Sequence, residues 1–221
     1  MKKKNLLLAM AFIVALSCNV EAQIGNAIKS AAKNATSKAL SDKLTLEKIP
    51  ATLEEFQALQ AELGTTPEGC IMLQLAAMEM YRRDRNVGEQ CLELNNTTTN
   101  FSDMKRRLSE LFRENDESYA RPYLVSTFFK GAKPSNGYNP SKPYTIQVRK
   151  DPTKQDERSQ MLKGYVKHFQ VYSDGYDTPW RGIDVVQQKG DEYYRVSNCP
   201  AILTQCKEVD FDATEDWKEL E

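Results

Sequence analysis

Few side chains of this sequence are of the types that catalyse reactions or bind metals, and there is one histidine. His168 is the single histidine of the 221-residue chain, and a catalytic base needs a nucleophile to activate. The Gly-x-Ser-x-Gly sequence that presents such a nucleophile is absent, as is a glycine-rich phosphate loop. Zinc needs several histidine or cysteine ligands at workable spacing. The sequence therefore predicts no catalytic residue, no metal and no cofactor, and we interpret His168 as a strand residue.

Carboxylates offer the alternative chemistry. Two acidic side chains that flank a glycosidic bond can hydrolyse it. Glu79 stands out because it lies in the largely apolar run 71–81, and we interpret it as exposed on the one open stripe of a buried helix. Sequence spacing does not reveal which carboxylates would pair. A hydrolase acting on glycans or envelope polymers therefore stays open as the alternative function.

Two stiffened loops form the candidate ligand site. Residues 126–148 combine three prolines with an Asn-Gly turn and four aromatic rings, and residues 173–182 hold a second turn. Either the rings plug the junction between helices and sheet, or they line a site for a glycan or peptide. A rigid loop loses little entropy when it binds. The candidate ligand-binding residues are Arg121, Tyr123, Phe129, Tyr138, Tyr144, Asp177, Trp180 and Arg181.

An ion pair is expected to tie the two loops together at one end of the sheet. Two alternatives are open, Arg121 with Asp177 or Arg181 with Asp174. Either pair would hold the candidate residues in one place.

The elements that must position these loops change type near residue 116. Capping patterns and helical spacing predict helices over 53–63, 67–84, 87–96 and 102–112. Alternation of period two then predicts strands, among them 144–148 and 164–172, and a hairpin turning near Gly190. Helices first and strands after indicate an α+β fold, with about four N-terminal helices packed on a C-terminal antiparallel β-sheet. Neither half can hide its apolar face alone, so we expect one domain, 49–211.

The ends of the chain carry signals of another kind. Residues 1–22 have a basic start, an apolar run and a small-residue cleavage site, which predicts a signal peptide. The alternative is a lipid anchor on Cys18. A polar arm, 23–48, and an acidic tail, 212–221, flank the domain. The protein is expected to be exported to the periplasm or the exterior, with no transmembrane segment in the mature chain.

Charge and cysteine content narrow the class further. Lys and Arg total 30 and Asp and Glu total 31, so the basic footprint of a nucleic-acid-binding protein is missing. Removal of the signal peptide would leave four cysteines, which can pair into disulfides in three ways. Cys70 and Cys91 would lie roughly 15 Å apart along two paired helices. The Cα atoms of two cysteines joined by a disulfide lie within about 7 Å of each other. We expect a Cys199–Cys206 disulfide, with the other two thiols in the core.

Two motifs carry a resemblance. They are Arg121-Pro122-Tyr123 and the run 129–140, which reads Phe-x-Gly-Ala-x-Pro-x-Asn-Gly-Tyr-x-Pro. With a turn at 175–181, in which Trp180 is an insertion, they resemble a family of exported bacterial proteins that is a domain of unknown function. The similarity covers roughly residues 50–205. It implies the fold and export, and it implies no activity.

The sequence therefore predicts an exported, non-catalytic domain that binds a partner or has an envelope-associated role. The partner classes left open are a glycan, a peptide and an envelope protein, with nucleic acid excluded.

Overall fold

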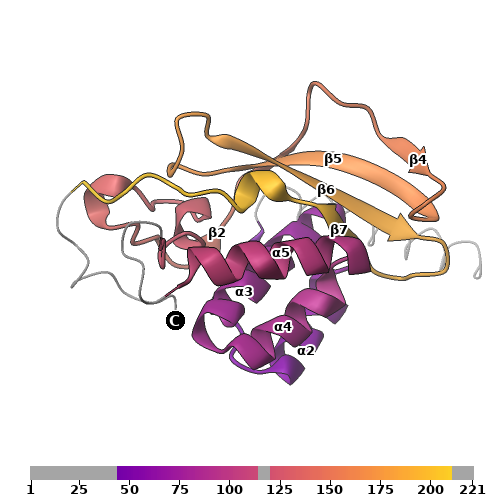
Figure 1. The fold of residues 1–221 in the computed structure, drawn as a ribbon, viewed down its shortest axis with the longest axis horizontal. Coiled ribbons are helices and arrows are strands. Elements are labelled where there is room, and N and C mark those ends of the chain that lie inside the picture. Colours follow the sequence, from indigo (N-terminus) through magenta and orange to yellow (C-terminus); the bar gives the residue numbers. More distant parts are fainter. Residues whose placement is uncertain (1–43, 114–119, 211–221) are drawn as a thin grey trace, which may run out of the picture. The chain divides into compact units, whose positions relative to one another are not determined.

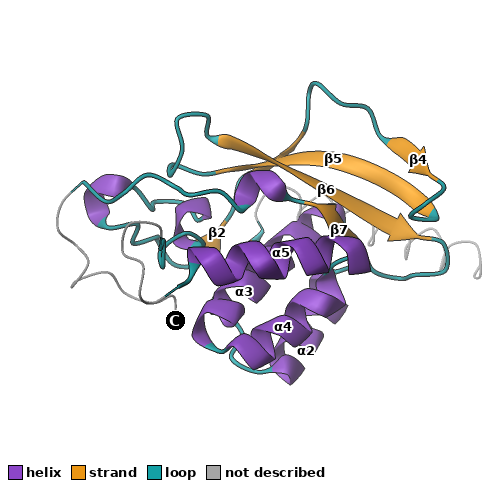
Figure 2. Ribbon diagram, viewed as in Figure 1, coloured by secondary structure: helices purple, strands orange, loops and turns teal. Residues whose placement is uncertain are grey.

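The computed structural model describes residues 44–113 and 120–210. The expected signal peptide, the arm up to residue 43 and the acidic tail lie outside the described residues. The helices are α2 (Leu53–Leu63), α3 (Pro67–Arg83), α4 (Arg85–Asn95) and α5 (Thr98–Leu111). The strands are β1 (Thr45–Leu46), β2 (Tyr144–Thr145), β3 (Val148–Lys150), β4 (Glu157–Ser159), β5 (Gly164–Tyr172), β6 (Trp180–Gln188) and β7 (Arg195–Asn198). Three short 3-10 helices lie at Ser126–Phe128, Pro134–Asn136 and Pro200–Ile202. The order confirms the predicted α+β fold (Figures 1 and 2).

The predicted helix starts are confirmed where a side chain caps them. Thr52 accepts a hydrogen bond from the Glu55 amide, and Thr66 accepts one from the Gly69 amide ahead of α3. Asp84 was expected to end the preceding helix, but it caps α4 by accepting from two amides of its first turn, so α4 begins two residues before its expected start. Helix α5 begins at Thr98, one turn before the expected start, and the Ser102 hydroxyl donates to the Thr98 carbonyl inside the helix. The polar threonine run is therefore helix and not loop.

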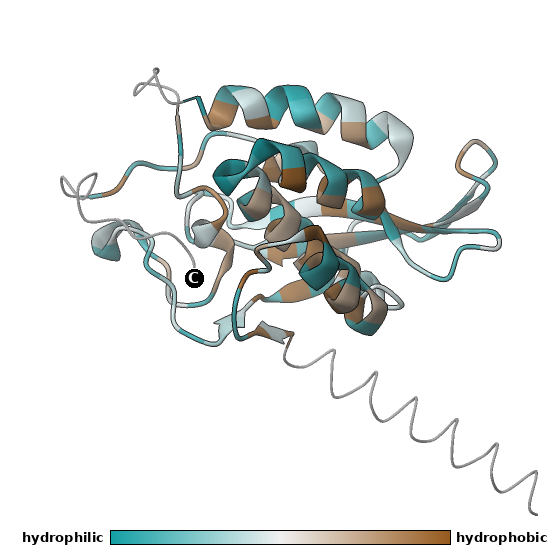
Figure 3. Ribbon diagram, turned by 90° about the horizontal axis from the view of Figure 1, so that it is seen from below, coloured by the Kyte–Doolittle hydropathy of each residue, from teal (hydrophilic) through white to brown (hydrophobic). Residues whose placement is uncertain are grey.

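Helix α3 is the centre of the domain. Every residue from Gly69 to Tyr81 is buried, and the helix contacts α2, α4, β6 and β7. Figure 3 shows apolar residues on the inward sides of the surrounding helices and hydrophilic residues on their outer sides. The interpretation of Glu79 as solvent-exposed is wrong, because its side chain is buried and bonded to Arg82 and Arg83 at 2.8 and 3.1 Å.

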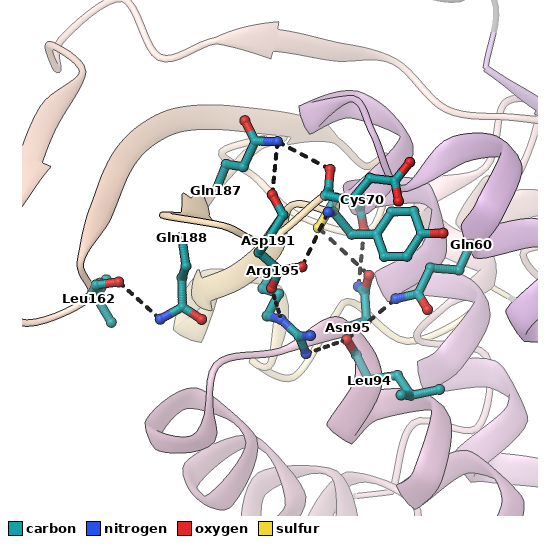
Figure 4. Close-up of polar contacts among 11 residues, drawn as sticks. Gln60, Cys70, Leu94, Asn95, Leu162, Gln187, Gln188, Asp191 and Arg195 are labelled. Carbon is teal, nitrogen blue, oxygen red and sulfur yellow. Dashed lines mark hydrogen bonds and ion pairs between the residues drawn. The ribbon is translucent and has the colours of Figure 1, made fainter.

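The sheet is antiparallel throughout, in the order β3-β5-β6-β7. Strand β4 pairs with the opposite end of β5 from β3. On the inner face, Phe169, Ile183 and Val185 are buried towards the helices. The alternate positions form the outer face, because neighbouring side chains along a strand point to opposite sides. The Arg195 guanidinium donates to the Leu94 carbonyl at 2.8 Å and so joins β7 to α4 (Figure 4).

The packed unit begins earlier than the sequence predicts. Residues 44–48 were assigned to the polar arm, but Leu44 and Leu46 are buried and β1 pairs with β2. The strand is only two residues long, too short for its alternation to be recognised in the sequence. The domain therefore includes these residues.

The crossing of α3 and α4 depends on a glycine. A Cβ atom on Gly88 would lie 2.1 Å from the Cα atom of Tyr81, so the two backbones are in contact. Gly88→Ala should lower the free energy of unfolding by about 1–3 kcal/mol, because the clash outweighs the better helix propensity of alanine. Urea denaturation would measure the change.

Gly182→Ala is the matched control, because no atom lies within 4 Å of a Cβ atom built on Gly182. The free energy of unfolding of this variant should not fall. A stabilising Gly88→Ala would contradict the close helix contact.

Candidate functional site

The residues predicted to bind a ligand hold a segment of the chain itself. Arg121 is buried, and its Nε donates to the Cys206 carbonyl at 3.1 Å. Its second guanidinium nitrogen contacts the Glu208 carboxylate at 2.9 Å. The Tyr138 hydroxyl donates to the Lys207 carbonyl at 3.1 Å. The loop that contains Tyr138 is thus hydrogen-bonded to the chain near residue 207.

The second loop holds the same segment from another side. The Tyr176 hydroxyl donates to the Thr204 carbonyl at 2.9 Å. Arg181 stacks on the Tyr176 ring, with 4.2 Å from the guanidinium carbon to the ring centre, and its Nε donates to the Ala201 carbonyl at 2.8 Å. Figure 1 shows this C-terminal segment, in yellow, running beside the loop that contains the Pro134–Asn136 turn.

Neither expected ion pair between the loops is formed, because residues 201–210 lie between them. Arg121 pairs with Glu208 instead of Asp177. Asp177 is exposed and pairs with Lys207 at 2.7 Å, and Asp174 accepts from the Tyr172 hydroxyl at 2.9 Å. The two loops are therefore joined through a third segment.

Four aromatic candidates, Tyr123 and three from the first loop, lie in the interior. The Tyr123 and Tyr138 rings stack with centres 5.1 Å apart, and Phe129 tilts against Tyr144 at 5.3 Å. All four side chains are buried. In this arrangement they seal the junction between the loops and the sheet.

The expected Cys199–Cys206 disulfide is not formed. Both thiols are free and buried, as are Cys70 and Cys91. The Cys199 sulfur lies 3.5 Å from the Asn100 side-chain nitrogen, beside α5. Cys206 lies against the second loop, where its Cβ atom is 3.1 Å from a Cβ built on Gly175. The 3-10 turn between them therefore delivers the two cysteines to different surroundings.

Trp180 is the one predicted candidate on the outer face of the sheet. The Tyr172 ring meets it edge-on with centres 5.3 Å apart. The Arg149 guanidinium lies over the Trp180 ring, 3.9 Å from its centre, while its Nε donates to the Gln170 side-chain oxygen at 2.9 Å. Cation–π stacking and a hydrogen bond thus fix the arginine.

A second polar pair lies further along the same face. The Nδ1 atom of His168 is 2.7 Å from the Asp184 carboxylate. That carboxylate also accepts from the Asn198 amide at 3.2 Å and lies 3.7 Å from the Lys154 ammonium. Cross-strand pairing places His168 opposite Asp184 and Tyr172 opposite Trp180.

Gly182 lies between these two pairs, opposite Gln170. Since no atom comes within 4 Å of a Cβ atom built on Gly182, the space above this glycine is open, and we call it the notch. Glycine inside a strand marks a bulge, a tight bend, or a place where a ligand or another backbone comes close. We call Arg149, His168, Gln170, Tyr172, Trp180, Gly182 and Asp184 the outer-face strip.

The sequence analysis found only part of this strip. Trp180 was named as a candidate and His168 as a strand residue. Arg149, Gln170, Tyr172, Gly182 and Asp184 were missed, although the alternation of β5 and a glycine inside β6 are visible in the sequence. Among the residues described, no group of three or more His, Cys, Asp or Glu is placed to hold a metal ion. Within the same residues, no helix is long and apolar enough to cross a membrane.

Fold and site together define an α+β domain with a helix-packed inner face, a polar and aromatic outer face, and loops that clasp their own C-terminal segment. The chain belongs to the family described as Domain of unknown function (DUF6935), whose model matches residues 48–210. Searches of curated proteins and of solved structures gave no significant match.

The buried thiols predict how stability depends on pH. Burial raises the pKa of Cys91, Cys199 and Cys206 from about 9 to about 12, and it also raises the pKa of Cys70. Above pH 9 the unfolded chain loses thiol protons that the folded chain keeps, so the free energy of unfolding should fall between about pH 9 and 12. Urea midpoints at pH 8, 9.5 and 11 would measure this, and Cys91→Ala should show a smaller fall.

Thiol labelling tests the same burial. In native buffer at pH 8.5, iodoacetamide should leave all four thiols unmodified, and in urea without reductant it should modify all four. Peptide mass spectrometry resolves each site. Protection of Cys199 and Cys206 that persists in urea would mean that a disulfide joins them.

Proposed function

We propose that this domain is an exported, non-catalytic module that binds a saccharide on the outer-face strip. The observation that carries the proposal is the open notch over Gly182, between the Tyr172–Trp180 rings and the His168–Asp184 pair. Loops that are fully engaged with residues 201–210 leave this strip as the better-exposed group of aromatic and polar side chains.

The residue types of the strip suit a sugar. The carbon–hydrogen face of a pyranose ring packs on aromatic side chains, and its hydroxyls need fixed donors and acceptors around it. Arg149 is exposed and Gln170 is partly exposed, and together they offer donors and an acceptor beside the notch. A glycine lets the ligand come close to the strand backbone. These features favour a glycan over a peptide, which would seek an unpaired strand edge.

The strip is also held in place before any ligand arrives. Arg149 is fixed by Trp180 and Gln170, and His168 is fixed by Asp184. Side chains that are already ordered lose little conformational entropy on binding. Pre-ordering therefore favours recognition through a shallow surface.

Export is part of the proposal and rests on residues 1–22. A mature chain that starts at Gln23 would mark a free protein, and one that starts at an acylated Cys18 would mark a lipid anchor. Mass spectrometry of the N-terminal peptide from cells distinguishes the two, and an intact Met1 would contradict export.

A hydrolase is the second candidate, and one observation favours it. Asp184 and His168 adjoin the notch as a buried pair, so a carboxylate lies next to the proposed sugar position. Release of new reducing ends that Asp184→Asn abolishes would replace the binding proposal with this one.

Gly182→Thr separates binding from folding. The site has open space, and threonine favours a strand, so the melting temperature should stay unchanged or rise. The added side chain fills the notch, and affinity for the sugar should fall at least about tenfold. Trp180→Ala should weaken binding by about the same factor because it removes the stacking ring.

Isothermal titration calorimetry with soluble disaccharide–peptide fragments of bacterial cell wall and a panel of neutral oligosaccharides would measure the affinities. Lys130→Ala, an exposed change on the first loop, is the control and should bind as the unmodified chain does. Undiminished binding by Gly182→Thr would remove the notch as the site.

A further inference from the structure

The exposed hydrophobic side chains are concentrated in one hairpin. In the described part of the chain, the large hydrophobic residues that stand exposed are Met161, at 81%, and Tyr165, at 54%. Both belong to the β4–β5 hairpin, where residues 160–163 form the turn. Met161 is thus the most exposed large hydrophobic side chain of the described residues.

Three cations surround this hairpin. A surface pocket of about 590 Å³ adjoins the turn, and Arg158, Lys163, Lys189 and Tyr165 contribute to its walls. None of its lining residues is acidic. Within the described ranges, the three basic side chains have no ion-pair partner, whereas Arg195 of the neighbouring strand pairs with Asp191. The charged side chains that line this pocket are therefore all basic.

The turn is held rigid by the neighbouring turn of the sheet. The Gln188 side chain donates to the Leu162 carbonyl at 2.9 Å (Figure 4). The Lys189 amide donates to the Lys163 carbonyl at 2.9 Å. Lys163 itself has a φ of 51°, in the left-handed region that costs energy for a residue with a side chain. Such strain persists where the surrounding structure fixes it, and it is common at functional positions.

We propose that this end of the sheet docks on a membrane that contains anionic phospholipids. Met161 enters the interface between headgroups and acyl chains, Tyr165 lies at headgroup level, and Arg158, Lys163 and Lys189 bind lipid phosphates. An apolar tip flanked by cations is the arrangement of interfacial membrane anchors. A soluble anion would use the cations and leave the exposed methionine without a role, so the lipid surface is the occupant that fits both observations.

This docking end is distinct from the outer-face strip. Strand β5 starts at the hairpin with Gly164 and ends at Tyr172, beside Trp180. The hairpin end of the sheet extends past the helices in Figure 1. A domain docked by Met161 would therefore hold the Tyr172–Trp180 end of its sheet away from the lipid. The inference stands whether or not the strip binds a sugar.

Vesicle co-sedimentation of the full chain tests the proposal. Vesicles of phosphatidylcholine that contain about 30% phosphatidylglycerol are compared with vesicles of pure phosphatidylcholine. Partitioning should favour the anionic vesicles and should fall as salt is raised to about 0.5 M. Each basic residue near such a surface contributes about fivefold to partitioning, so Lys163→Gln/Lys189→Gln should lose about 25-fold. Met161→Ser should also weaken binding to the anionic vesicles.

The matched control is Lys130→Gln/Lys133→Gln, which removes the same charge from two exposed lysines of the first loop. It should partition as the unmodified chain does, and all variants share residues 1–43, so any contribution of those residues is common to them. Equal losses in the two double variants would mean that only net charge matters and would overturn the site. Binding to a soluble anionic polysaccharide that Met161→Ser leaves unchanged, without preference for anionic vesicles, would overturn the lipid assignment.

Discussion

The complete burial of α3 is the constraint on which the rest of this structure depends. A helix buried from Gly69 to Tyr81 must satisfy every polar group it carries, because an unpaired polar atom in the interior is costly. Gln74 meets this requirement through Asn95 and Asn96, whose side-chain nitrogens donate to its oxygen at 3.1 and 2.9 Å. Glu79 meets it through two arginines. The contacts of Gln74 therefore fix how α4 lies against α3.

This constraint also decides where the domain can act. The inner face of the sheet covers α3, and the stiff loops bind residues 201–210. The outer-face strip and the hairpin end of the sheet lie outside both of these contacts. The proposed sugar contact and the proposed lipid contact use these two regions, so one twisted sheet would present a ligand and a membrane surface at different ends.

The sequence predicted the parts of this fold that have local causes. Threonine caps and an apolar run located α2 and α3, and period-two alternation located β5 and the β6–β7 hairpin. Arg121 and Arg181 each bind a backbone carbonyl, and these partners could not be predicted because every residue has a carbonyl. The position of Gly182 on the outer face could not be predicted, because it depends on the strand register that places Gly182 opposite Gln170. Cys199 and Cys206 are near in sequence, yet the 3-10 turn between them leads to separate environments, and sequence distance does not report this.

Amide hydrogen exchange under native conditions is the most direct test of whether α3 ties the helices and the sheet into one body. Amides of α3, α4, β5 and β6 should exchange with one common free energy, equal to that of global unfolding measured by urea. Their values should fall together when Gly88→Ala weakens the helix contact. Helical amides that stay protected while those of β5 and β6 exchange freely would contradict the account, because the helices would then fold without the sheet.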